Sequence, residues 1–228
     1  MMTSIFGKID FLNLLPLHIY LKKYPLPSGL KKAMEYKKGV PSKLNKDLRY
    51  RRVGAAVVSS VTTQQKSYKK LDIGICANKK VHSVLIQKHT SDEKDPASAT
   101  SNILALVLQQ QGRVIIGDKA LRLYLQDKSQ FIDLCEVWHY KYNLPFVFAR
   151  FCCVYNLPFY KKIFTPFLRR KIYIPRYILD IYANSRQISP TQIQAYLKLI
   201  YYKISCKEKK ALKLFLSKAQ NYLKRSKE

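Results

Sequence analysis

The chain has 228 residues, of which 42 are Lys or Arg and 14 are Asp or Glu, so it carries a formal net charge of +28 at pH 7. Its hydrophobic fraction of 47% and aromatic fraction of 12% exclude a disordered chain in spite of this charge. No apolar run approaches the roughly 18–20 residues that a membrane-spanning helix needs, and residues 1–17 lack the pattern of a signal peptide. We therefore expect a folded, cytoplasmic protein with no membrane partner.

The residue types that mark common enzyme sites are scattered through the sequence. The five cysteines include no Cys-x-x-Cys pair, so we expect reduced thiols rather than a disulfide framework or a zinc site. The seven glycines form no nucleotide-binding fingerprint, and the four histidines stand apart. The sequence thus predicts no metal and no cofactor, which removes the easily recognised enzymes but not every enzyme.

Up to residue 126, apolar runs that predict strands alternate with helical patterns. The expected strands are 4–11, 34–38, 53–58, 73–77, 81–87 and 113–116, and the expected helices are 17–23, 43–48, 102–110 and 119–126. Pro16 fits a first helical turn, where its missing N–H is not needed. The hydroxyls of 98–101 are typical of a helix N-terminus, and Gly117-Asp118 is interpreted as a turn.

Residues 130–136 are expected to be extended, and 145–154 to form a long apolar strand. Helical patterns then dominate, at about 158–170, 175–184, 190–204 and 207–225. The run 53–58 is apolar throughout, which suits a parallel strand buried on both faces. The pattern predicts the α/β fold class with parallel sheets.

The positive charge is spread along the chain. Residues 1–159 hold 25 basic and 11 acidic side chains, and residues 160–228 hold 17 and 3. In the C-terminal part the lysines alternate with apolar residues at helical spacing, which indicates a solvated helix face. No helix-turn-helix, zinc-finger or RNA-recognition signature accompanies them. We therefore favour a generally basic surface over a nucleic-acid partner, although a functional polyanion face stays open.

Small hydrogen-bonding side chains follow the predicted strands. Ligands of open α/β sheets bind beyond the carboxyl ends of strands, and hydroxyls at a helix N-terminus suit a carboxylate. Each residue alone has an ordinary explanation as a cap or turn former, and Asp118 is as well explained by a helix cap as by a ligand contact. The set comprises Asn13, Ser59, Ser60, Ser83, Ser98, Thr100, Ser101 and Asp118.

Several segments, in order, resemble motifs of the chorismate dehydratase family, whose enzymes act in the futalosine route to menaquinone. They are Phe11–Leu17 (FLNLLPL), Gly39–Asn45 (GVPSKLN), Val57–Ser60 (VVSS), Val81–Leu85 (VHSVL), Ser98–Ser101 (SATS), Ile116–Leu121 (IGDKAL) and Asp133–Ala149. The resemblance spans almost the whole chain. The sequence departs from the family pattern at Gly54, Val57 and His82.

The resemblance implies a two-lobed fold like that of type II periplasmic binding proteins, with a ligand cleft between the lobes. Residues 1–85 and 141–228 would form the first lobe and 86–140 the second, with crossovers near 84–87 and 134–140. It further implies that the enzyme removes water from chorismate, a small dianion, to give 3-[(1-carboxyvinyl)oxy]benzoate. Asn13 is the implied catalytic residue. The implied substrate-binding residues are Ser59, Ser60, Ser83, Thr100 and Ser101.

Two other functions stay open at this point. One is a related enzyme of the same route that acts on cyclic dehypoxanthine futalosine, or a solute-binding relative of the same fold. The other is a basic nucleic-acid-binding protein. The sequence does not distinguish a monomer from a homodimer.

Overall fold

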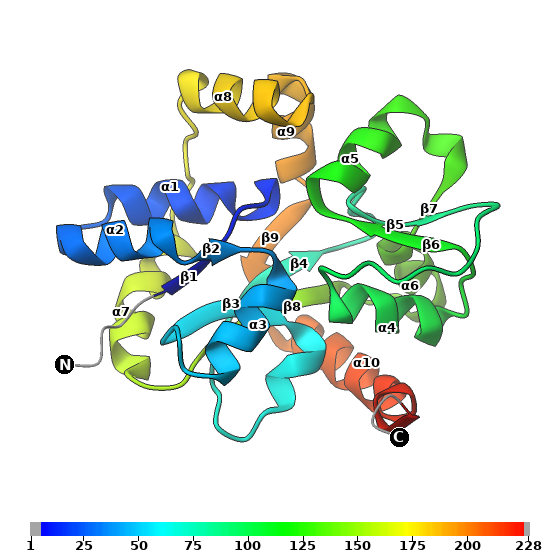
Figure 1. The fold of residues 1–228 in the computed structure, drawn as a ribbon, viewed down its shortest axis with the longest axis horizontal. Helices are drawn as coiled ribbons and strands as arrows, with labels where there is room; N and C mark the ends of the chain where they lie inside the picture. Colours follow the sequence, from blue (N-terminus) through cyan, green and yellow to red (C-terminus); the bar gives the residue numbers. More distant parts are fainter. Residues whose placement is uncertain (1–5, 226–228) are drawn as a thin grey trace.

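The strands form two sheets in the computed structural model, which describes residues 6–225. The six-stranded sheet has the order β2 (Lys38–Gly39), β1 (Phe6–Ile9), β3 (Ala55–Ser59), β8 (Phe146–Cys153), β4 (Lys69–Ala77) and β9 (Ile200–Lys203). The three-stranded sheet has the order β6 (Arg113–Ile116), β5 (Val84–Gln87) and β7 (Phe131–Asp133). Figure 1 shows the smaller sheet and its helices as a separate body at one side of the larger sheet.

Helices surround both sheets. The helices are η1 (Leu12–Leu14), α1 (Leu15–Lys23), α2 (Ser28–Tyr36), α3 (Pro41–Arg49), η2 (Ser60–Gln64), α4 (Ala99–Leu108), α5 (Gly117–Gln126), η3 (Lys128–Gln130), α6 (Leu134–Tyr142), α7 (Leu157–Phe167), α8 (Arg176–Arg186), α9 (Pro190–Leu197) and α10 (Cys206–Arg225). The α/β fold class is confirmed. No helix in residues 6–225 has the length and apolar character that crossing a membrane requires.

The prediction of parallel sheets was wrong for most strands. Strand β1 pairs in parallel with β2 and β3, but β3, β8, β4 and β9 pair antiparallel, as do all strands of the smaller sheet. The apolar run in β3 is indeed buried at every residue. Burial on both faces, however, does not determine the direction of the neighbouring strand.

Three further segments differ from the sequence prediction. Residues 34–38, expected as a strand, mostly belong to α2, and β2 is only two residues long. The helix expected over 190–204 ends at Leu197 and is followed by β9, which pairs with β4. Gly117 and Asp118, expected as a turn, are the first residues of α5.

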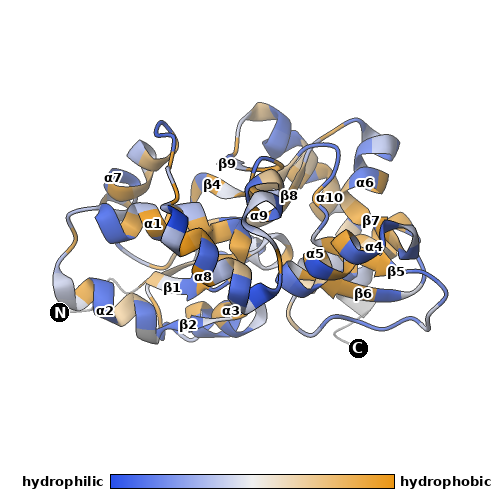
Figure 2. Cartoon of the chain, turned by 90° about the horizontal axis from the view of Figure 1, so that it is seen from above, coloured by the Kyte–Doolittle hydropathy of each residue, from blue (hydrophilic) through white to orange (hydrophobic). Residues whose placement is uncertain are grey.

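The chain changes sheet twice, between β4 and β5 and between β7 and β8. All strands of the smaller sheet therefore come from residues 84–133, while the larger sheet takes strands from both sides of that segment. The residue boundaries of the lobes stay a prediction. One buried apolar cluster runs through both bodies, with Leu104 of α4, Trp138 of α6, Phe146 of β8 and Phe215 of α10 among its members. Figure 2 shows β5, β6 and α4 as largely apolar where they face one another.

Asp133 connects the two segments through which the chain passes from one sheet to the other. Its carboxylate accepts hydrogen bonds from the backbone N–H groups of Val81 and His82 at 2.8 and 2.7 Å, in the segment before β5. It also accepts from Cys135 and Glu136 at the start of α6. Burial raises the pKa of Asp133, and these backbone donors oppose the rise. One buried side chain thus fixes the two segments between which the smaller sheet is inserted.

Candidate functional site

A cavity lies where the two sheets meet. Counted with its open mouth, it encloses about 500 Å³. It is lined by Ile9, Phe11, Asn13, Pro41, Ser59, Ile75, Val81, Ser83, Val84, Ser98, Ser101, Ile116, Gly117, Phe148 and Ala149. Residues of β1, β3, β4 and β8 thus face residues of β5 and β6 across it. None of these lining residues carries a formal charge.

Three helices begin at this cavity. Pro41 opens α3, Ser98 is the N-cap of α4, and Gly117 is the first residue of α5. The N-terminus of a helix carries a partial positive charge and unpaired N–H groups. A neutral lining with three such termini therefore suits a ligand with more than one carboxylate.

Gly117 is the residue that allows α5 to begin this close to β1. Its φ of +72° lies in the left-handed region, and a Cβ atom there would approach the Phe11 ring to 2.9 Å. Its N–H donates to the carbonyl of Ser83 at 2.8 Å. A larger residue would thus be strained and would push Phe11 aside.

Asn13 lies in η1, directly after β1. Pro16 sits in the first turn of α1, which turns the chain immediately behind Asn13. The carbonyl of Asn13 accepts a hydrogen bond from the Tyr202 hydroxyl at 2.7 Å. Its side-chain Oδ1 is buried and has no partner among the described residues. A buried polar atom without a partner is costly, so the described residues leave the hydrogen bonding of this side chain, which lines the cavity, incomplete.

Ser83 reaches the cavity from the segment between β4 and β5. Its hydroxyl lies 2.9 Å from the hydroxyl of Tyr196, a residue of α9. Burial raises the pKa of Tyr196, and the hydrogen bond with Ser83 opposes this rise. Tyr196 thus joins Ser83 to α9 beside the cavity.

Two other predicted binding residues also line the cavity. Ser59 at the end of β3 is held by Asn45, whose amide oxygen accepts from the Ser59 N–H and whose NH₂ donates to the Ser59 hydroxyl, each at 3.1 Å. Ser101 lies 2.9 Å from Ser98, hydroxyl to hydroxyl, and its N–H donates to that N-cap hydroxyl. Hydroxyls are thus fixed on two sides of the cavity.

Ser60 and Thr100 do not line the cavity. The Ser60 hydroxyl donates to the carbonyl of Val147 at 2.6 Å, and the Thr100 hydroxyl accepts from the N–H of Val61. Both side chains are buried. These two hydrogen bonds attach η2, which follows Ser59, to β8 and to α4. A role of Ser60 and Thr100 in substrate binding stays a prediction.

Asp118 is not a helix cap, so that interpretation was wrong. The residue before α5 that occupies the cap position is Ile116, and Asp118 lies within the first turn. One oxygen accepts from the N–H of Leu12 at 2.9 Å and the other from Arg186 of α8 at 3.2 Å. Burial raises its pKa, and these two donors oppose the rise. Asp118 thus joins α5 to η1 and α8 at the edge of the cavity.

His82 stands next to Ser83 but does not line the cavity. Its ring stacks on Tyr124 of α5, with centroids 4.5 Å apart. Burial, aided by Lys80 and Lys128, lowers its pKa to about 4. The imidazole is therefore neutral at pH 7 and packs on α5 rather than into the site.

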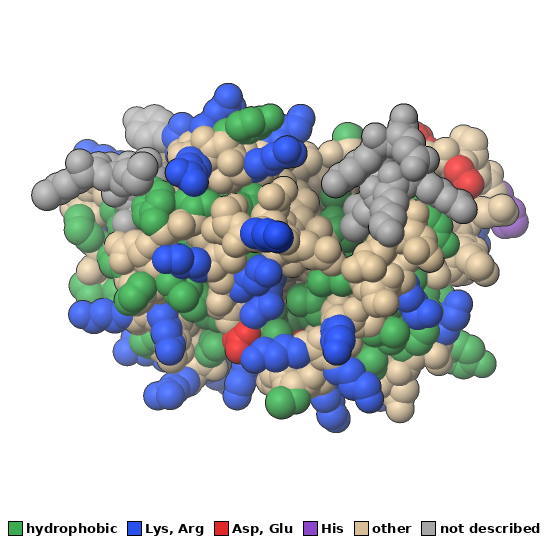
Figure 3. Space-filling view, turned by 90° about the horizontal axis from the view of Figure 1, so that it is seen from below, with side chains coloured by type: hydrophobic (Ala, Val, Ile, Leu, Met, Phe, Trp, Pro, Cys, Tyr) green, Lys and Arg blue, Asp and Glu red, His purple; other side chains and the backbone are tan. Residues whose placement is uncertain are grey.

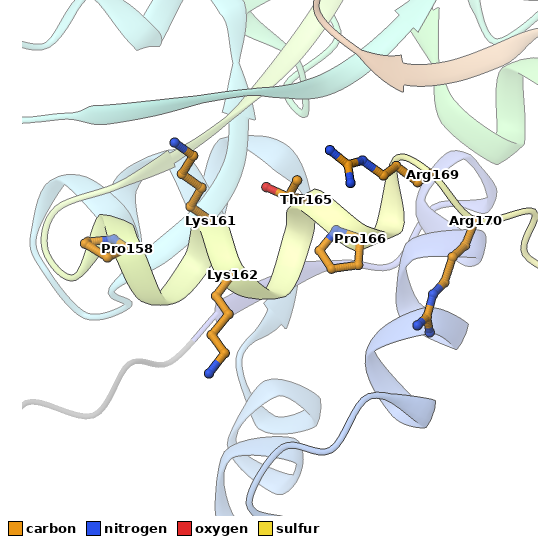
Figure 4. A pocket seen from close by; sticks show the side chains of 7 residues that line it. All are labelled: Pro158, Lys161, Lys162, Thr165, Pro166, Arg169 and Arg170. Atoms are coloured by element: carbon orange, nitrogen blue, oxygen red, sulfur yellow. The ribbon is translucent and has the colours of Figure 1, made fainter.

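A second depression, on α7, is lined by four cations but lacks a convergent site. It is lined by Pro158, Lys161, Lys162, Thr165, Pro166, Arg169 and Arg170. Figure 4 shows Lys161 and Arg169 on one side of the helix and Lys162 and Arg170 on the other. Their charges do not meet at one point, so they do not form a pocket for a small anion. Within residues 6–225, no three His, Cys, Asp or Glu side chains are grouped as metal ligands.

The sequence missed Tyr196, Tyr202 and Asn45. Tyr196 and Tyr202 both fall within the helix that the pattern predicts over 190–204, and neither was assigned a role at the site. A segment rich in β-branched and aromatic residues, such as 200–203, was the available signal for a strand. Nothing local indicated that the Tyr202 hydroxyl would meet Asn13, 189 positions away, or that the Tyr196 hydroxyl would meet Ser83.

The comparisons with known proteins identify the family of this chain and support its fold. A family model described as menaquinone biosynthesis matches residues 5–111 and 95–221. The chain is 63% identical over 213 residues to a curated chorismate dehydratase of Campylobacter jejuni subsp. jejuni serotype O:23/36 (strain 81-176), covering 93% of this chain and 96% of that protein.

Solved structures support the fold alone. A protein of Archaeoglobus fulgidus superposes with a TM-score of 0.72 at 10% identity, covering 95% of this chain and 96% of that one. A Candida albicans protein described as having the generic periplasmic binding protein fold superposes with a TM-score of 0.52 at 11% identity, covering 96% and 94%. The predicted fold class is confirmed. Because the family model and the curated relative each span most of the chain, the chain belongs to the menaquinone biosynthesis family.

Proposed function

We propose that this chain is a chorismate dehydratase, which converts chorismate to 3-[(1-carboxyvinyl)oxy]benzoate and water. The observation that carries the proposal is a neutral cavity, lined by Asn13, onto which three helix N-termini open. The 63% identity to a curated enzyme of that name supports it. The enzyme class that follows is a carbon–oxygen lyase.

The two carboxylates of chorismate are matched by the helix N-termini. The hydroxyls of Ser98 and Ser101 at α4 and of Ser59 at the end of β3 lie on two sides of the lining. Hydroxyl and backbone N–H donors hold an anion without adding a positive side chain that would bind it too firmly. We infer that one carboxylate binds at the start of α4 beside Ser59, and the other near Gly117 and Ser83.

The reaction removes the proton from ring C3 and the hydroxyl from C4, so one C–H bond and one C–O bond break and water leaves. The ring becomes aromatic, so much of the driving force belongs to the substrate. The protein must therefore position groups and stabilise charge. The leaving hydroxyl gains negative charge on its oxygen, so a hydrogen-bond donor assists its departure, and Asn13, which lines the cavity, carries such a donor in its side-chain NH₂ group.

An amide is a poor base, so Asn13 orients the leaving hydroxyl rather than taking the C3 proton. The described lining residues include no His, Asp or Glu. We propose that the enolpyruvyl carboxylate of the substrate itself accepts the proton. The hydroxyls and helix N-termini that bind this carboxylate also hold it next to C3. The same contacts therefore serve substrate binding and proton transfer.

The test is to incubate the purified protein with chorismate and follow products by liquid chromatography and mass spectrometry. A product lighter than chorismate by one water, with a benzoate absorption spectrum, is expected. Isomers formed by spontaneous rearrangement keep the mass of chorismate and serve as the background. Absence of the dehydrated product, with a known dehydratase active in parallel, would contradict the proposal.

A further inference from the structure

Asn45 and Ser59 are joined by two hydrogen bonds whose directions follow from their chemistry. The Asn45 Oδ1 accepts from the backbone N–H of Ser59, and the Asn45 NH₂ donates to the Ser59 Oγ, each at 3.1 Å. A backbone N–H donates and never accepts, so the amide oxygen must be the atom that faces it. The NH₂ group then faces the hydroxyl, and the amide has one orientation.

This arrangement determines what the Ser59 hydroxyl offers. An amide NH₂ donates and does not accept, so the Ser59 oxygen accepts from it and the hydroxyl hydrogen points elsewhere. Among the described residues, no group accepts this hydrogen. Ser59 is 2% exposed and lines the cavity. Its hydrogen is therefore left for an acceptor that enters the cavity.

The start of α3 explains why Asn45 reaches Ser59. Pro41 and Asn45 are four residues apart, so they lie on the same face of the helix, and Pro41 lines the cavity. Leu44 and Leu48 are both buried in the main apolar cluster and anchor the helix there. The Asn45 amide is therefore held beside the end of β3 by a packed helix.

A carboxylate accepts hydrogen bonds and cannot donate them, whereas a serine hydroxyl that rotates can do either. We propose that Asn45 is a positioning residue that makes the Ser59 hydroxyl a hydrogen-bond donor to a carboxylate of the substrate. This inference rests on the proposed function for the identity of the ligand, chorismate, but not for the contact itself. An oxygen in place of the Asn45 NH₂ would take the hydroxyl hydrogen and turn only lone pairs toward the substrate.

The experiment is a double-mutant cycle of Asn45→Asp and Ser59→Ala, read as kcat/KM for chorismate. Asn45→Asp keeps an oxygen for the Ser59 N–H but replaces the NH₂ by a second oxygen. It also adds a negative charge, which weakens the binding of a dianion whether or not the hydroxyl is present. The Ser59→Ala background measures this charge effect alone, so the difference between the two backgrounds measures the hydroxyl.

Asn102→Asp is the matched control. The Asn102 amide, near the start of α4, also contacts the backbone with both ends, since it accepts from the Asp95 N–H at 2.9 Å and donates to the Asp95 carbonyl at 2.8 Å. Asn102 does not line the cavity. Its replacement adds a carboxyl group without contacting the Ser59 hydroxyl, so we expect the same change in kcat/KM in both backgrounds.

We expect Ser59→Ala to lower kcat/KM by about tenfold or more, because a hydrogen bond to a charged group is lost. Asn45→Asp should lower kcat/KM at least about fivefold more in the wild-type background than in Ser59→Ala. If Asn45→Asp does not fold, as judged by circular dichroism, the same cycle with Asn45→Ala decides, and the larger loss is again expected in the wild-type background.

A second readout needs no substrate. In ¹⁵N-labelled protein, the side-chain NH₂ signal of Asn45 is identified by its disappearance in Asn45→Asp or Asn45→Ala. We expect Ser59→Ala to shift this signal, because the NH₂ group loses its acceptor, and to leave the NH₂ signal of Asn102 unchanged.

Equal effects of the Asn45 substitution in the two backgrounds overturn the proposal, because they assign the loss to charge or to folding rather than to the hydroxyl. An unchanged kcat/KM in Ser59→Ala overturns it as well, and so does an Asn45 NH₂ signal that does not move in that variant. If wild type does not convert chorismate, the proposed function fails, and the NMR signal alone decides whether Asn45 holds the Ser59 hydroxyl.

Discussion

Ser59 and Ser60 are neighbours in sequence, yet only Ser59 lines the cavity, while Ser60 donates to the Val147 carbonyl. Replacing Ser60 by Ala leaves that buried carbonyl without its side-chain donor. We expect Ser60→Ala to lower the free energy of unfolding by about 1–3 kcal/mol with little change in KM for chorismate. Urea unfolding and steady-state kinetics measure the two effects. A large rise in KM at unchanged stability would show that Ser60 binds substrate after all.

His18 gives the protein a buried titratable group. It is 4% exposed, neither ring nitrogen has a partner among the described residues, and burial together with Lys8 and Lys22 lowers its pKa well below its ordinary value of 6.5. As the pH falls below 6.5, His18 becomes protonated in the unfolded chain but stays neutral in the folded one. Protonation therefore favours the unfolded chain, and the free energy of unfolding decreases as the pH falls below 6.5.

We therefore expect the unfolding free energy of wild type to fall more between pH 7.5 and 5.5 than that of His18→Gln, by about 1 kcal/mol. Urea titrations at the two pH values measure the difference. Equal pH dependence in the two proteins would mean that His18 does not contribute to acid sensitivity.

For single residues, the sequence predicted correctly the cavity-lining side chains that follow a strand or lie at the start of a helix. Asn13, Ser59, Ser83 and Ser101 could be predicted to come together because strand ends and helix starts share one edge, and all four line the cavity. Their roles in binding and catalysis stay predictions. Tyr196 could not be found, since a buried tyrosine on a helix has the same pattern as a core phenylalanine until its partners are known.

Among the elements, the segments that join the two sheets depend on Asp133. It accepts four backbone hydrogen bonds, two before β5 and two at the start of α6. We expect Asp133→Ala to lower the unfolding free energy by about 3 kcal/mol or more, because buried N–H groups lose their acceptor. Asp127→Ala is the control, since Asp127 caps η3 from an exposed position. Similar losses in both variants, measured by denaturant unfolding, would contradict the role given to Asp133.

Physical reasons explain why some elements were predicted wrongly from the sequence. The helical pattern of 190–204 continued through 200–203, but pairing with β4 makes the last part a strand, because tertiary contacts override weak local preference. The apolar run of β3 indicated burial correctly, while its antiparallel partner β8 lies almost 90 residues away in sequence. Direction and partner of a strand depend on the whole chain rather than on its own residues.

For the molecule as a whole, the charge of +28 calls for an explanation of its own. Figure 3 shows Lys and Arg spread over one face among hydrophobic and neutral residues rather than gathered in a patch. The cavity lining, by contrast, is neutral. A basic field over a neutral site favours the approach of a small dianion without holding it.

Three exposed lysines of α10 test this account of the charge. We expect the triple variant Lys207→Gln, Lys210→Gln and Lys213→Gln to keep kcat within about twofold and to lower kcat/KM modestly at low salt only, since screening removes long-range attraction. Steady-state kinetics at low and at physiological ionic strength measure this. A collapse of kcat would place these lysines in the catalytic machinery.

The central claim is that Asn13 acts on the substrate within a cavity that binds it by other groups. The most direct measurement compares chorismate binding and single-turnover rate in wild type and Asn13→Ala, by calorimetry and by rapid-quench analysis of the dehydrated product. We predict binding within about tenfold of wild type and a rate at least about 100-fold lower, with an unchanged circular dichroism spectrum. An Asn13→Ala protein that forms the product at nearly the wild-type rate would contradict the account.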